Sequence, residues 1–332
     1  MILVVGGAGY IGSHMVRLLR ESNEPHLVLD NLENGHRAAV GDSPLVQGDL
    51  RDPASLARVF ADNPRIDTVI HMAAYIAVGE SEREPGKYWT NNVAGVLNLL
   101  EAMRTAGVSK LVFSSTAAVF GEPQYTPIDE AHPKAPTSVY GDTKLAVERM
   151  LDGYDRAHGL KSVCLRYFNA CGASPDASIG EDHFPEEHLV PLAIYAAMGR
   201  RAALKVFGTD WPTPDGTCVR DYVHVLDLAS AHLLAIKHLR QGGESRKYNL
   251  GNGKGFSVRE VLDSVGRVAG KPVPADDAPR RPGDPAVLIA SSAAIRDAWG
   301  WTPKYNDLDE IVRHAWAWHD SHPNGYGDRA AS

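Results

Sequence analysis

Short apolar runs alternate with amphipathic stretches over the first 115 residues. In the amphipathic stretches, apolar residues recur at helical spacing. Apolar runs separated by such helices are typical of parallel strands that are covered on both faces, as in a doubly wound α/β sheet. We expect strands at 2–5, 27–29, 45–50, 68–74 and 110–115, with helices at 12–21, 53–62 and 91–106.

The pattern continues and then changes after Cys171. Residues 139–159 predict a long helix and 161–169 another buried strand. Beyond them, Pro and Gly residues separate short segments, and this change of pattern indicates a smaller lobe. Residues 219–239 predict a strand, a turn and a strong helix that returns to the first domain. We expect short helices at 188–199, 257–269 and 308–318.

These patterns predict two discontinuous domains, which suits a chain of 332 residues because one hydrophobic core rarely serves that length. The first is a doubly wound, parallel-sheet Rossmann domain, and the second is a smaller mixed α/β substrate domain. The predicted boundaries are 1–172 with 219–255 for the first domain, and 173–218 with 256–332 for the second.

Composition excludes several functional classes. With 44% hydrophobic and 23% charged residues, the chain is an ordinary globular protein. A net charge of -7 gives no basic surface for nucleic acid or anionic membranes, so any anionic ligand must be held by local donors. No apolar run approaches the roughly 20 residues of a membrane span, and no signal peptide opens the chain, so we expect a cytoplasmic protein.

Three cysteines occur without C-x-x-C spacing, at Cys164, Cys171 and Cys218. An odd number without that spacing argues against a disulfide framework and against a structural zinc site. We therefore expect reduced thiols and no metal centre.

A glycine-rich turn follows the first predicted strand. Gly6, Gly9 and Gly12 stand where the strand ends and the first helix opens. Glycines allow the tight turn and a close approach of the backbone to a pyrophosphate, which the helix N-terminus attracts. Asp30 ends the second strand, where a carboxylate accepts the ribose hydroxyls of NAD and repels the additional phosphate of NADP. Asp49 either accepts from adenine or caps a helix.

Tyr140 and Lys144 form a Tyr-x-x-x-Lys pair on one face of the predicted 139–159 helix. A nearby ammonium and a positive nicotinamide ring both stabilise a phenolate, so Tyr140 is the candidate base. Thr116 ends the fifth predicted strand, where a hydroxyl can orient a substrate alcohol. The alternative for this group is an exposed helix pair beside a buried threonine.

Together the motifs resemble the UDP-glucose 4-epimerase family of the extended short-chain dehydrogenase superfamily. The resemblance runs through residues 1–326 and includes GGAGYIGSH, YGDTKLAVE, RYFNACGA, VRDYVHV and PRRPGD. It implies a galactose-metabolism isomerase with tightly held NAD, a UDP-sugar substrate and a homodimer formed through residues 91–106 and 139–157. Implied cofactor residues are Gly6, Gly9, Tyr10, Ile11, Gly12, Asp30, Asn31, Asp49, Leu50, Ala73, Asn91, Lys144 and Phe168.

The same resemblance assigns the substrate side. Thr116 and Tyr140 meet the sugar, Asn169 the nucleotide sugar and Phe207 the uracil. The arginines also fit the residue-based argument, because an acidic chain needs guanidinium groups to hold a diphosphate; alone, each could equally form a surface salt bridge. The implied substrate residues are Thr116, Tyr140, Asn169, His188, Leu189, Phe207, Arg220, Arg281, Asp284 and Leu288.

Four positions depart from the family pattern. Ile76 stands where some members carry a lysine beside the cofactor. His188 stands where some carry an asparagine on the diphosphate side, and it could also be only a loop residue. Phe120 replaces a frequent tyrosine. Leu288 replaces a bulky tyrosine against the sugar, which leaves room for an N-acetyl group, unless Leu288 faces the core.

The expected reaction inverts C4 of UDP-glucose and UDP-galactose through a 4-keto sugar, and extends to UDP-N-acetylhexosamines. A related epimerase of UDP-pentoses or UDP-uronic acids is the first alternative. A dehydratase is disfavoured because Ala117 and Ala118 follow Thr116 where that reaction needs an acid and base pair. The second alternative is a non-catalytic NAD-sensing protein, which has no need of Tyr140 and Lys144.

Overall fold

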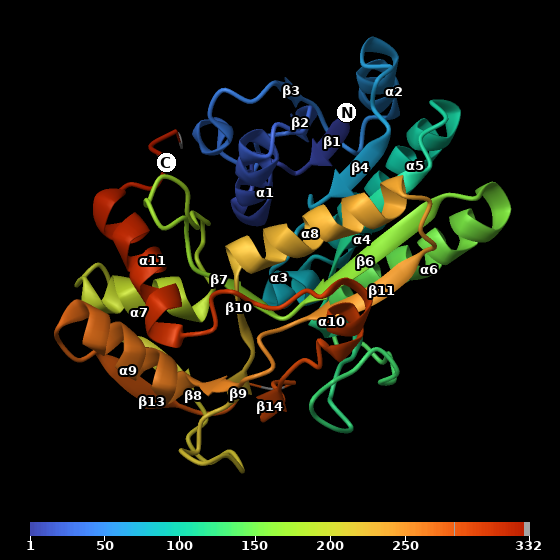
Figure 1. Cartoon of the computed structure of the whole chain (residues 1–332). Coiled ribbons are helices and arrows are strands. Elements are labelled where there is room, and N and C mark those ends of the chain that lie inside the picture. The colour runs from blue at the N-terminus through green and yellow to red at the C-terminus, as the bar shows by residue number, and fades with distance from the viewer. Residues whose placement is uncertain (282, 329–332) are drawn as a thin grey trace. The chain divides into compact units, whose positions relative to one another are not determined.

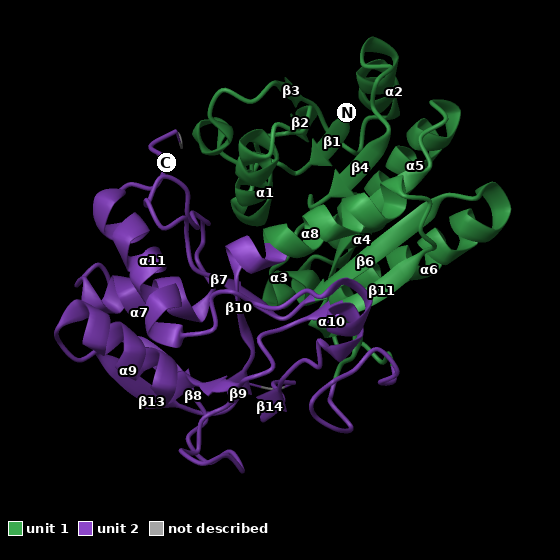
Figure 2. Ribbon diagram, in the orientation of Figure 1, with its two compact units in different colours: residues 1–121, 134–166, 229–248 green, residues 122–133, 167–228, 249–332 purple. Residues whose placement is uncertain are grey.

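A computed structural model describes residues 1–281 and 283–328. The chain forms two compact units, each assembled from separate segments (Figure 2). Unit 1 comprises residues 1–121, 134–166 and 229–248, and unit 2 comprises residues 122–133, 167–228 and 249–332. The domain boundaries predicted from sequence differ from these units at 122–133, 167–172, 219–228 and 249–255, and they stay a prediction.

A seven-stranded sheet in the order β11-β6-β5-β4-β1-β2-β3 organises the first unit (Figure 1). The central strands pair in parallel, from β3 through β2, β1 and β4 to β5. This is the expected doubly wound α/β sheet. Its strands are β1 (Ile2–Val5), β2 (His26–Asp30), β3 (Leu45–Gln47), β4 (Thr68–His71), β5 (Lys110–Thr116), β6 (Lys161–Tyr167) and β11 (Arg246–Leu250).

Alternate residues of these strands face opposite sides of the sheet. Leu3, Val5 and Phe113 pack with helices α2 (Pro53–Asp62), α5 (Gly95–Thr105) and α6 (Val139–His158) in one buried cluster. On the other side, α1 (Tyr10–Glu21) contacts β1 and β2, and α8 (Val225–Arg240) runs in front of the sheet in Figure 1. Coverage on both faces explains why the strands are almost continuously apolar.

Further short elements complete the first unit. A π-helical segment at Thr90–Ala94 precedes α5, so the expected 91–106 helix exists with a widened first turn. The other elements are α3 (Val78–Arg83), α4 (Pro85–Trp89) and short 3-10 turns at Arg37–Val40 and Ala117–Val119.

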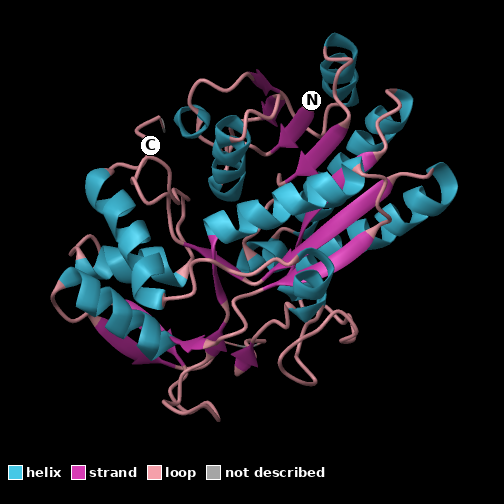
Figure 3. Cartoon of the chain, viewed as in Figure 1, coloured by secondary structure: helices cyan, strands magenta, loops and turns pink. Residues whose placement is uncertain are grey.

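Unit 2 is a mixed α/β assembly of short strands and helices, as Figure 3 shows. Its core joins α7 (Leu189–Ala197), α9 (Val258–Ala269) and α11 (Leu308–Ser321). Two- and three-stranded sheets pair β10 with β7, β13 with β8, and β9 with β12 and β14. The remaining bounds are β7 (Asn169–Cys171), β8 (Leu204–Phe207), β9 (Val219–Arg220), β10 (Tyr222–His224), β12 (Phe256–Ser257), β13 (Ala275–Ala278), β14 (Val287–Leu288) and α10 (Ala293–Trp299).

Three strands are shorter than the sequence indicates. The expected 68–74 strand ends at His71. The expected 45–50 strand ends at Gln47, which is the last residue in register with Asp30. The expected 161–169 strand ends at Tyr167, and Asn169 begins a separate strand paired with β10. The three cysteines are free and buried, as expected. Within residues 1–281 and 283–328, no helix combines the length and apolarity of a bilayer span.

Candidate active site

The glycine turn between β1 and α1 is set by contacts within unit 1. Gly6 has a φ of +79°, and a Cβ there would overlap the backbone of Ala73. A Cβ on Gly12 would overlap the Gly6 carbonyl oxygen. Both positions therefore require glycine so that the turn closes and the helix starts beside the strand.

Gly9 is different because the protein leaves room for a side chain there. It is the N-cap residue of α1 and has extended dihedral angles, and an added Cβ would make only an ordinary 3.6 Å contact with the Gly6 oxygen. No side chain caps this helix. A bare N-terminal turn with space above Gly9 fits the pyrophosphate of a dinucleotide, which binds main-chain N–H groups and the positive end of the helix dipole.

Asp30 connects the end of β2 to this turn. Its Oδ2 accepts from the Ala8 amide at 2.9 Å, and its Oδ1 accepts from the Leu32 amide at 2.9 Å. The residue is only 8% exposed, and burial raises the pKa of its carboxyl. Each oxygen keeps a lone pair that can accept a ribose hydroxyl. Asp30 therefore lies where a diol-binding carboxylate is expected, next to the phosphate-binding turn.

Asp49 is not a helix cap. The N-cap of α2 is Asp52, whose side chain accepts from the Ala54 amide, so the capping alternative for Asp49 is wrong. Asp49 instead accepts from Asn31 Nδ2 at 3.0 Å and pairs with Arg51, which holds the pKa of the Asp49 carboxyl well below its usual range. Contact with adenine stays a prediction for Asp49.

The other predicted cofactor residues occupy varied environments. Tyr10 and Ile11 form the first turn of α1, and Asn91 donates to the side chain of Asn92. Leu50 is 6% exposed and belongs to the hydrophobic core. Ala73, at the loop after β4, packs against the same core, and Phe168 in unit 2 donates its amide to the Leu250 carbonyl. Their contact with a cofactor stays a prediction.

Thr116, Tyr140 and Lys144 come together in unit 1. Thr116 ends β5, and its hydroxyl forms a hydrogen bond with Tyr140, which lies in the first turn of α6. Lys144, one turn later, lies with its Nζ 6.0 Å from the centre of the Tyr140 ring and donates to the Ser114 carbonyl at 2.9 Å. The predicted set of base, cation and orienting hydroxyl is therefore assembled at the carboxyl end of the sheet.

Burial disfavours the charged forms of both members of the pair. It raises the pKa of Tyr140 to about 12, although the Thr116 hydrogen bond opposes the shift. It lowers the pKa of Lys144 to about 7. The protein groups alone therefore keep the phenol protonated near neutral pH, and an additional positive charge is needed beside it to favour the phenolate.

A buried ion pair that the sequence analysis missed fixes the α6 helix. Glu148 is one turn beyond Lys144, and Arg166 on β6 donates to it from Nε at 2.9 Å and Nη2 at 2.7 Å. Ser115 donates to the same carboxylate at 2.6 Å. Burial raises the pKa of Glu148, but Arg166 outweighs it, so that pKa is below its usual range. The i, i+4, i+8 spacing places Tyr140, Lys144 and Glu148 on one helix face, and this spacing could have indicated Glu148 from the sequence.

Ser81 is a second missed contact. Its hydroxyl accepts from the Tyr140 amide at 3.2 Å, which holds the start of α6 against the Val78–Arg83 helix. Ser81 is fully buried. Nothing in its local sequence indicates this contact, since Ser81 and Tyr140 are distant in the chain.

In unit 2, four of the predicted substrate residues form one cluster. Asp284 lies 3.6 Å from Arg220 Nη2 and accepts from Arg281 Nε at 3.1 Å. The Arg281 guanidinium stacks 4.5 Å from the centre of the Phe207 ring. Two guanidinium groups beside an aromatic ring suit a nucleoside diphosphate, because the cations bind phosphate oxygens and the ring can contact a base.

Asn169 and Leu288 lie on strands that adjoin this cluster. Leu288 is in parallel register with Arg220, and its carbonyl accepts from the Asp221 amide at 3.1 Å. Asn169 donates its amide to the Asp221 carbonyl at 2.9 Å. Leu288 is only partly buried, so the core alternative does not describe it fully.

His188 directly precedes α7, and Leu189 begins that helix. The His188 Nδ1 lies 2.9 Å from both Glu181 and Glu186. Leu189 packs partly against the unit 2 core. These contacts of His188 and Leu189 involve other residues than the Arg220 cluster, so their substrate roles stay predictions.

Comparisons with known proteins agree with this geometry. The family model "NAD dependent epimerase/dehydratase family" matches residues 2–251. The chain belongs to the NAD-dependent epimerase/dehydratase family. A UDP-glucose 4-epimerase of Halalkalibacterium halodurans is 54% identical over 98% of this chain and 97% of its own length.

Solved structures extend the likeness to the whole fold. One crystal structure of a UDP-glucose 4-epimerase has a TM-score of 0.96 at 50% identity, covering 98% of this chain and 99% of that one. The enzyme of Bifidobacterium longum, in complex with NAD+ and UDP, has a TM-score of 0.92 at 38% identity, covering 98% of this chain and 99% of that one. Membership of the family makes the enzyme NAD-dependent and explains the glycine turn with Asp30.

One departure from the resemblance, Phe120, has a structural explanation. Phe120 is 1% exposed, with the Arg166 guanidinium 5.2 Å from its ring centre, so a phenyl ring without a hydroxyl suits this buried position. Ile76 is 42% exposed. Nothing in the structure explains why isoleucine occupies that position.

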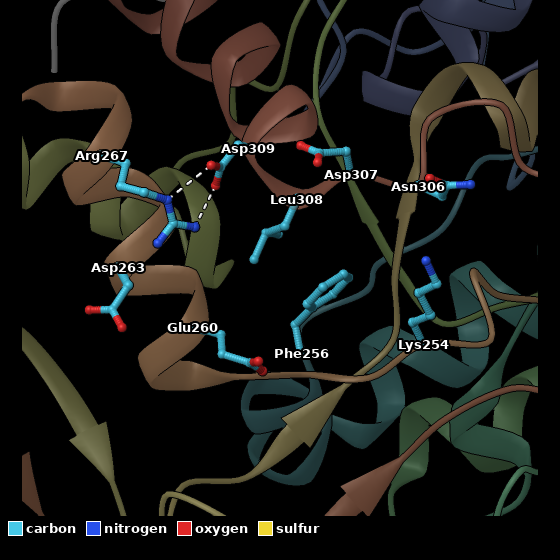
Figure 4. A pocket seen from close by; sticks show the side chains of 9 residues that line it. All are labelled: Lys254, Phe256, Glu260, Asp263, Arg267, Asn306, Asp307, Leu308 and Asp309. Carbon is cyan, nitrogen blue, oxygen red and sulfur yellow. Dashed lines mark hydrogen bonds and ion pairs between the residues drawn. The ribbon is translucent and has the colours of Figure 1, made fainter.

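A pocket elsewhere in unit 2 contains no predicted site residue (Figure 4). It lies between α9 and the start of α11 and is lined by acidic and basic side chains, including the Arg267–Asp309 ion pair. Glu260 accepts from the Ser257 amide in a capping box, and Asp307 accepts from the Glu310 amide. These carboxylates cap helices, so this pocket is not the candidate active site.

Proposed function

We propose that this protein is a UDP-glucose 4-epimerase that interconverts UDP-glucose and UDP-galactose. One observation carries the proposal. Tyr140, hydrogen-bonded to Thr116 and one helical turn from Lys144, occurs in a chain that matches UDP-glucose 4-epimerases over nearly its full length.

In unit 1, the glycine turn and α1 would hold the NAD pyrophosphate, and Asp30 would accept the adenosine ribose hydroxyls. Asn31 and Asp49 would flank the adenine, and Lys144 would bind the nicotinamide ribose. When bound, NAD would supply hydride-transfer chemistry at C4 of the sugar. The space above Gly9 and the hydrogen bonds of Asp30 support this placement.

Tyr140 removes the proton of the C4 hydroxyl and later returns it. Because burial raises the pKa of the Tyr140 phenol to about 12, Tyr140 needs an additional positive charge beside it to act as a base near neutral pH, and bound NAD would supply that charge. Thr116 orients the C4 hydroxyl toward the phenol oxygen. The 4-keto sugar turns over before it is reduced on its other face.

Unit 2 binds the nucleotide. Arg220 and Arg281, positioned by Asp284, hold the diphosphate, and Phe207 contacts the uracil. Asn169, His188 and Leu189 complete the nucleotide-sugar contacts. Tight binding of UDP and loose binding of the hexose are both required, since a ring fixed in one pose cannot present its other face.

The direct test supplies UDP-galactose to purified protein without added cofactor and follows the sugar nucleotides by chromatography. We expect UDP-glucose to accumulate to equilibrium, and Tyr140→Phe to lower turnover by at least about 100-fold while NAD stays bound. A Tyr140→Phe protein with more than about a tenth of wild-type turnover would show that Tyr140 is not the base.

UDP-N-acetylhexosamines are a second class of substrate that one observation favours. The register partner of Arg220 is Leu288, a side chain smaller than tyrosine, and it is only partly buried. Related reactions on UDP-pentoses or UDP-uronic acids have no such feature in their favour. The Ala117–Ala118 sequence after Thr116 continues to disfavour a dehydratase.

The homodimer and the cytoplasmic location are part of the same proposal. Leu97, on α5 within the proposed 91–106 interface, is 43% exposed, and Trp89, at the end of α4 just before that range, is 42% exposed. Exposed apolar side chains on and beside the proposed interface support self-association. A mass of two chains by light scattering is the expected result.

A further inference from the structure

The segment between residues 181 and 188 of unit 2 gathers two carboxylates and two imidazoles. One ligand atom from each of Glu181, His183, Glu186 and His188 lies within 4.8 Å of the other three. Glu181 Oε1 is 3.1 Å from His183 Nδ1 and 2.9 Å from His188 Nδ1. His188 Nδ1 is also 2.9 Å from Glu186 Oε1.

Both carboxylates of this cluster are buried. The side chains of Glu181 and Glu186 are 4% and 5% exposed, and within residues 1–281 and 283–328 Glu186 Oε2 has no hydrogen-bond partner. His183 Nδ1 lies 3.9 Å from this oxygen, beyond hydrogen-bond distance. An ionised oxygen removed from water without a hydrogen bond is costly, and a bound cation would remove that cost.

We propose that Glu181, His183, Glu186 and His188 bind one divalent transition-metal ion, of which Zn²⁺ fits best. Two imidazole nitrogens and two carboxylate oxygens are ordinary zinc ligands, and four such atoms around one ion is the usual number for a structural site. Bonds of about 2.0–2.2 Å in tetrahedral geometry separate neighbouring ligand atoms by about 3.3 Å. Three of the nitrogen–oxygen separations, at 2.9–3.1 Å, are close to this spacing, and all four ligand atoms lie within 4.8 Å of one another.

Charge supports the same assignment. Two carboxylates with neutral imidazoles leave a net charge of about -2, which one divalent ion cancels. The alternative is a set of ion pairs between protonated histidines and glutamates. That alternative satisfies Glu181 and one oxygen of Glu186, but leaves Glu186 Oε2 unsatisfied.

The site would also define how His188 meets a ligand. Coordination through Nδ1 leaves the ring proton on Nε2, so the outer edge of the imidazole becomes a fixed hydrogen-bond donor. The side chain is 40% exposed. This consequence rests on the proposed function, but metal binding itself does not.

No metal centre was expected from the sequence, because the expectation rested on the number and spacing of the cysteines. The ligands instead form the pattern Glu-x-His-x-x-Glu-x-His, in one short segment before α7. Because all four ligands lie in one short segment, a bound ion would stabilise that segment and would not connect elements that are distant in the sequence.

The test uses the full-length protein without a histidine tag. Protein is stripped with EDTA, dialysed, exposed to Zn²⁺ and desalted, and its metal content is measured by plasma mass spectrometry. We expect about one Zn²⁺ per chain and a higher unfolding temperature than the stripped protein. Less than about a tenth of an equivalent in the wild-type protein would overturn the proposal.

Two matched variants separate the cluster from incidental binding. Glu186→Gln should weaken Zn²⁺ binding at least about tenfold, as loss of a metal ligand does at minimum. Glu187→Gln changes the exposed neighbouring carboxylate and should bind Zn²⁺ as the wild type does. Equal affinity in the two variants would overturn the assignment, since the ion would then bind elsewhere.

Spectroscopy of the wild type keeps the test decisive even if Glu186→Gln fails to fold. Co²⁺ in place of Zn²⁺ should give the intense visible bands of four-coordinate cobalt, and Zn²⁺ should abolish them in competition. The weak bands of six-coordinate cobalt would contradict a tetrahedral site of these four side chains. Neither readout depends on epimerase activity, so this proposal and the proposed function fail separately.

Discussion

The Asp30 carboxylate is expected to serve both the backbone of the glycine turn and the cofactor. Its carboxylate accepts the Ala8 and Leu32 amides and is placed to accept the ribose hydroxyls. These contacts within unit 1 make the carboxylate part of the glycine turn as well as of the proposed cofactor site. A substitution here should act on dinucleotide binding first.

Asp30→Ala should lower NAD occupancy of the purified protein or allow NADP to bind, because the loss of charge-assisted hydrogen bonds weakens NAD binding by about 10- to 100-fold. Nucleotide extracted from the protein and identified by chromatography measures this directly. Asp42→Ala is the control, since Asp42 is exposed. NADP in the wild-type protein would overturn the role of Asp30.

Leu288 is the residue on which substrate range depends. If it borders the sugar, Leu288→Tyr should lower turnover of UDP-N-acetylglucosamine at least about tenfold more than turnover of UDP-glucose, because only the larger sugar clashes. Leu288→Met, of similar volume, should spare both reactions. Kinetics on the two sugars decide this, and equal losses, or a wild type inactive on the N-acetylated sugar, would refute it.

At the scale of elements, α6 is held to β6 by the Glu148–Arg166 pair. Glu148→Gln leaves a guanidinium buried without its counter-charge and should lower the free energy of unfolding by about 3–5 kcal/mol. Glu21→Gln, in the exposed pair with Arg17, should change it by less than about 1 kcal/mol. Urea denaturation of the three proteins measures both differences, and similar values for the two variants would contradict the account.

The same pair has a defined pH dependence. Arg166 holds the pKa of Glu148 below its usual range in the folded protein, so the stabilisation is complete above the pKa of the unfolded chain. It is lost as the pH falls through the folded pKa. The stability difference between wild type and Glu148→Gln should therefore shrink in acid.

Sequence patterns predicted the elements of the large sheet well, because strands such as Ile2–Val5 are buried on both faces and are read from apolar runs alone. The sequence did not predict the bounds of the two-residue strand at Val219–Arg220, because its pairing depends on distant segments. Tyr140 and Lys144 were found from spacing and context. Glu148 and Ser81 were missed because their partners are remote in the chain.

At the scale of the whole molecule, each unit contains different groups that the proposed reaction needs. Unit 1 contains the turn, the carboxylate and the acid–base group for NAD chemistry, and unit 2 contains the guanidinium groups for a diphosphate. A chain with a net charge of -7 attracts an anionic substrate only through such local groups. The proposed mechanism therefore assigns nucleotide specificity to groups of unit 2 and the acid–base chemistry to groups of unit 1.

The most direct test of the account follows an isotope through one turnover. Purified protein without added cofactor receives UDP-galactose deuterated at C4 of the sugar, in ordinary water, and the products are examined by NMR. We predict UDP-glucose that keeps the deuterium at C4. The hydrogen bonded to C4 leaves and returns without exchange with water, whereas Tyr140 exchanges only the proton of the hydroxyl. Loss of the deuterium to solvent, or no UDP-glucose at all, would contradict the account.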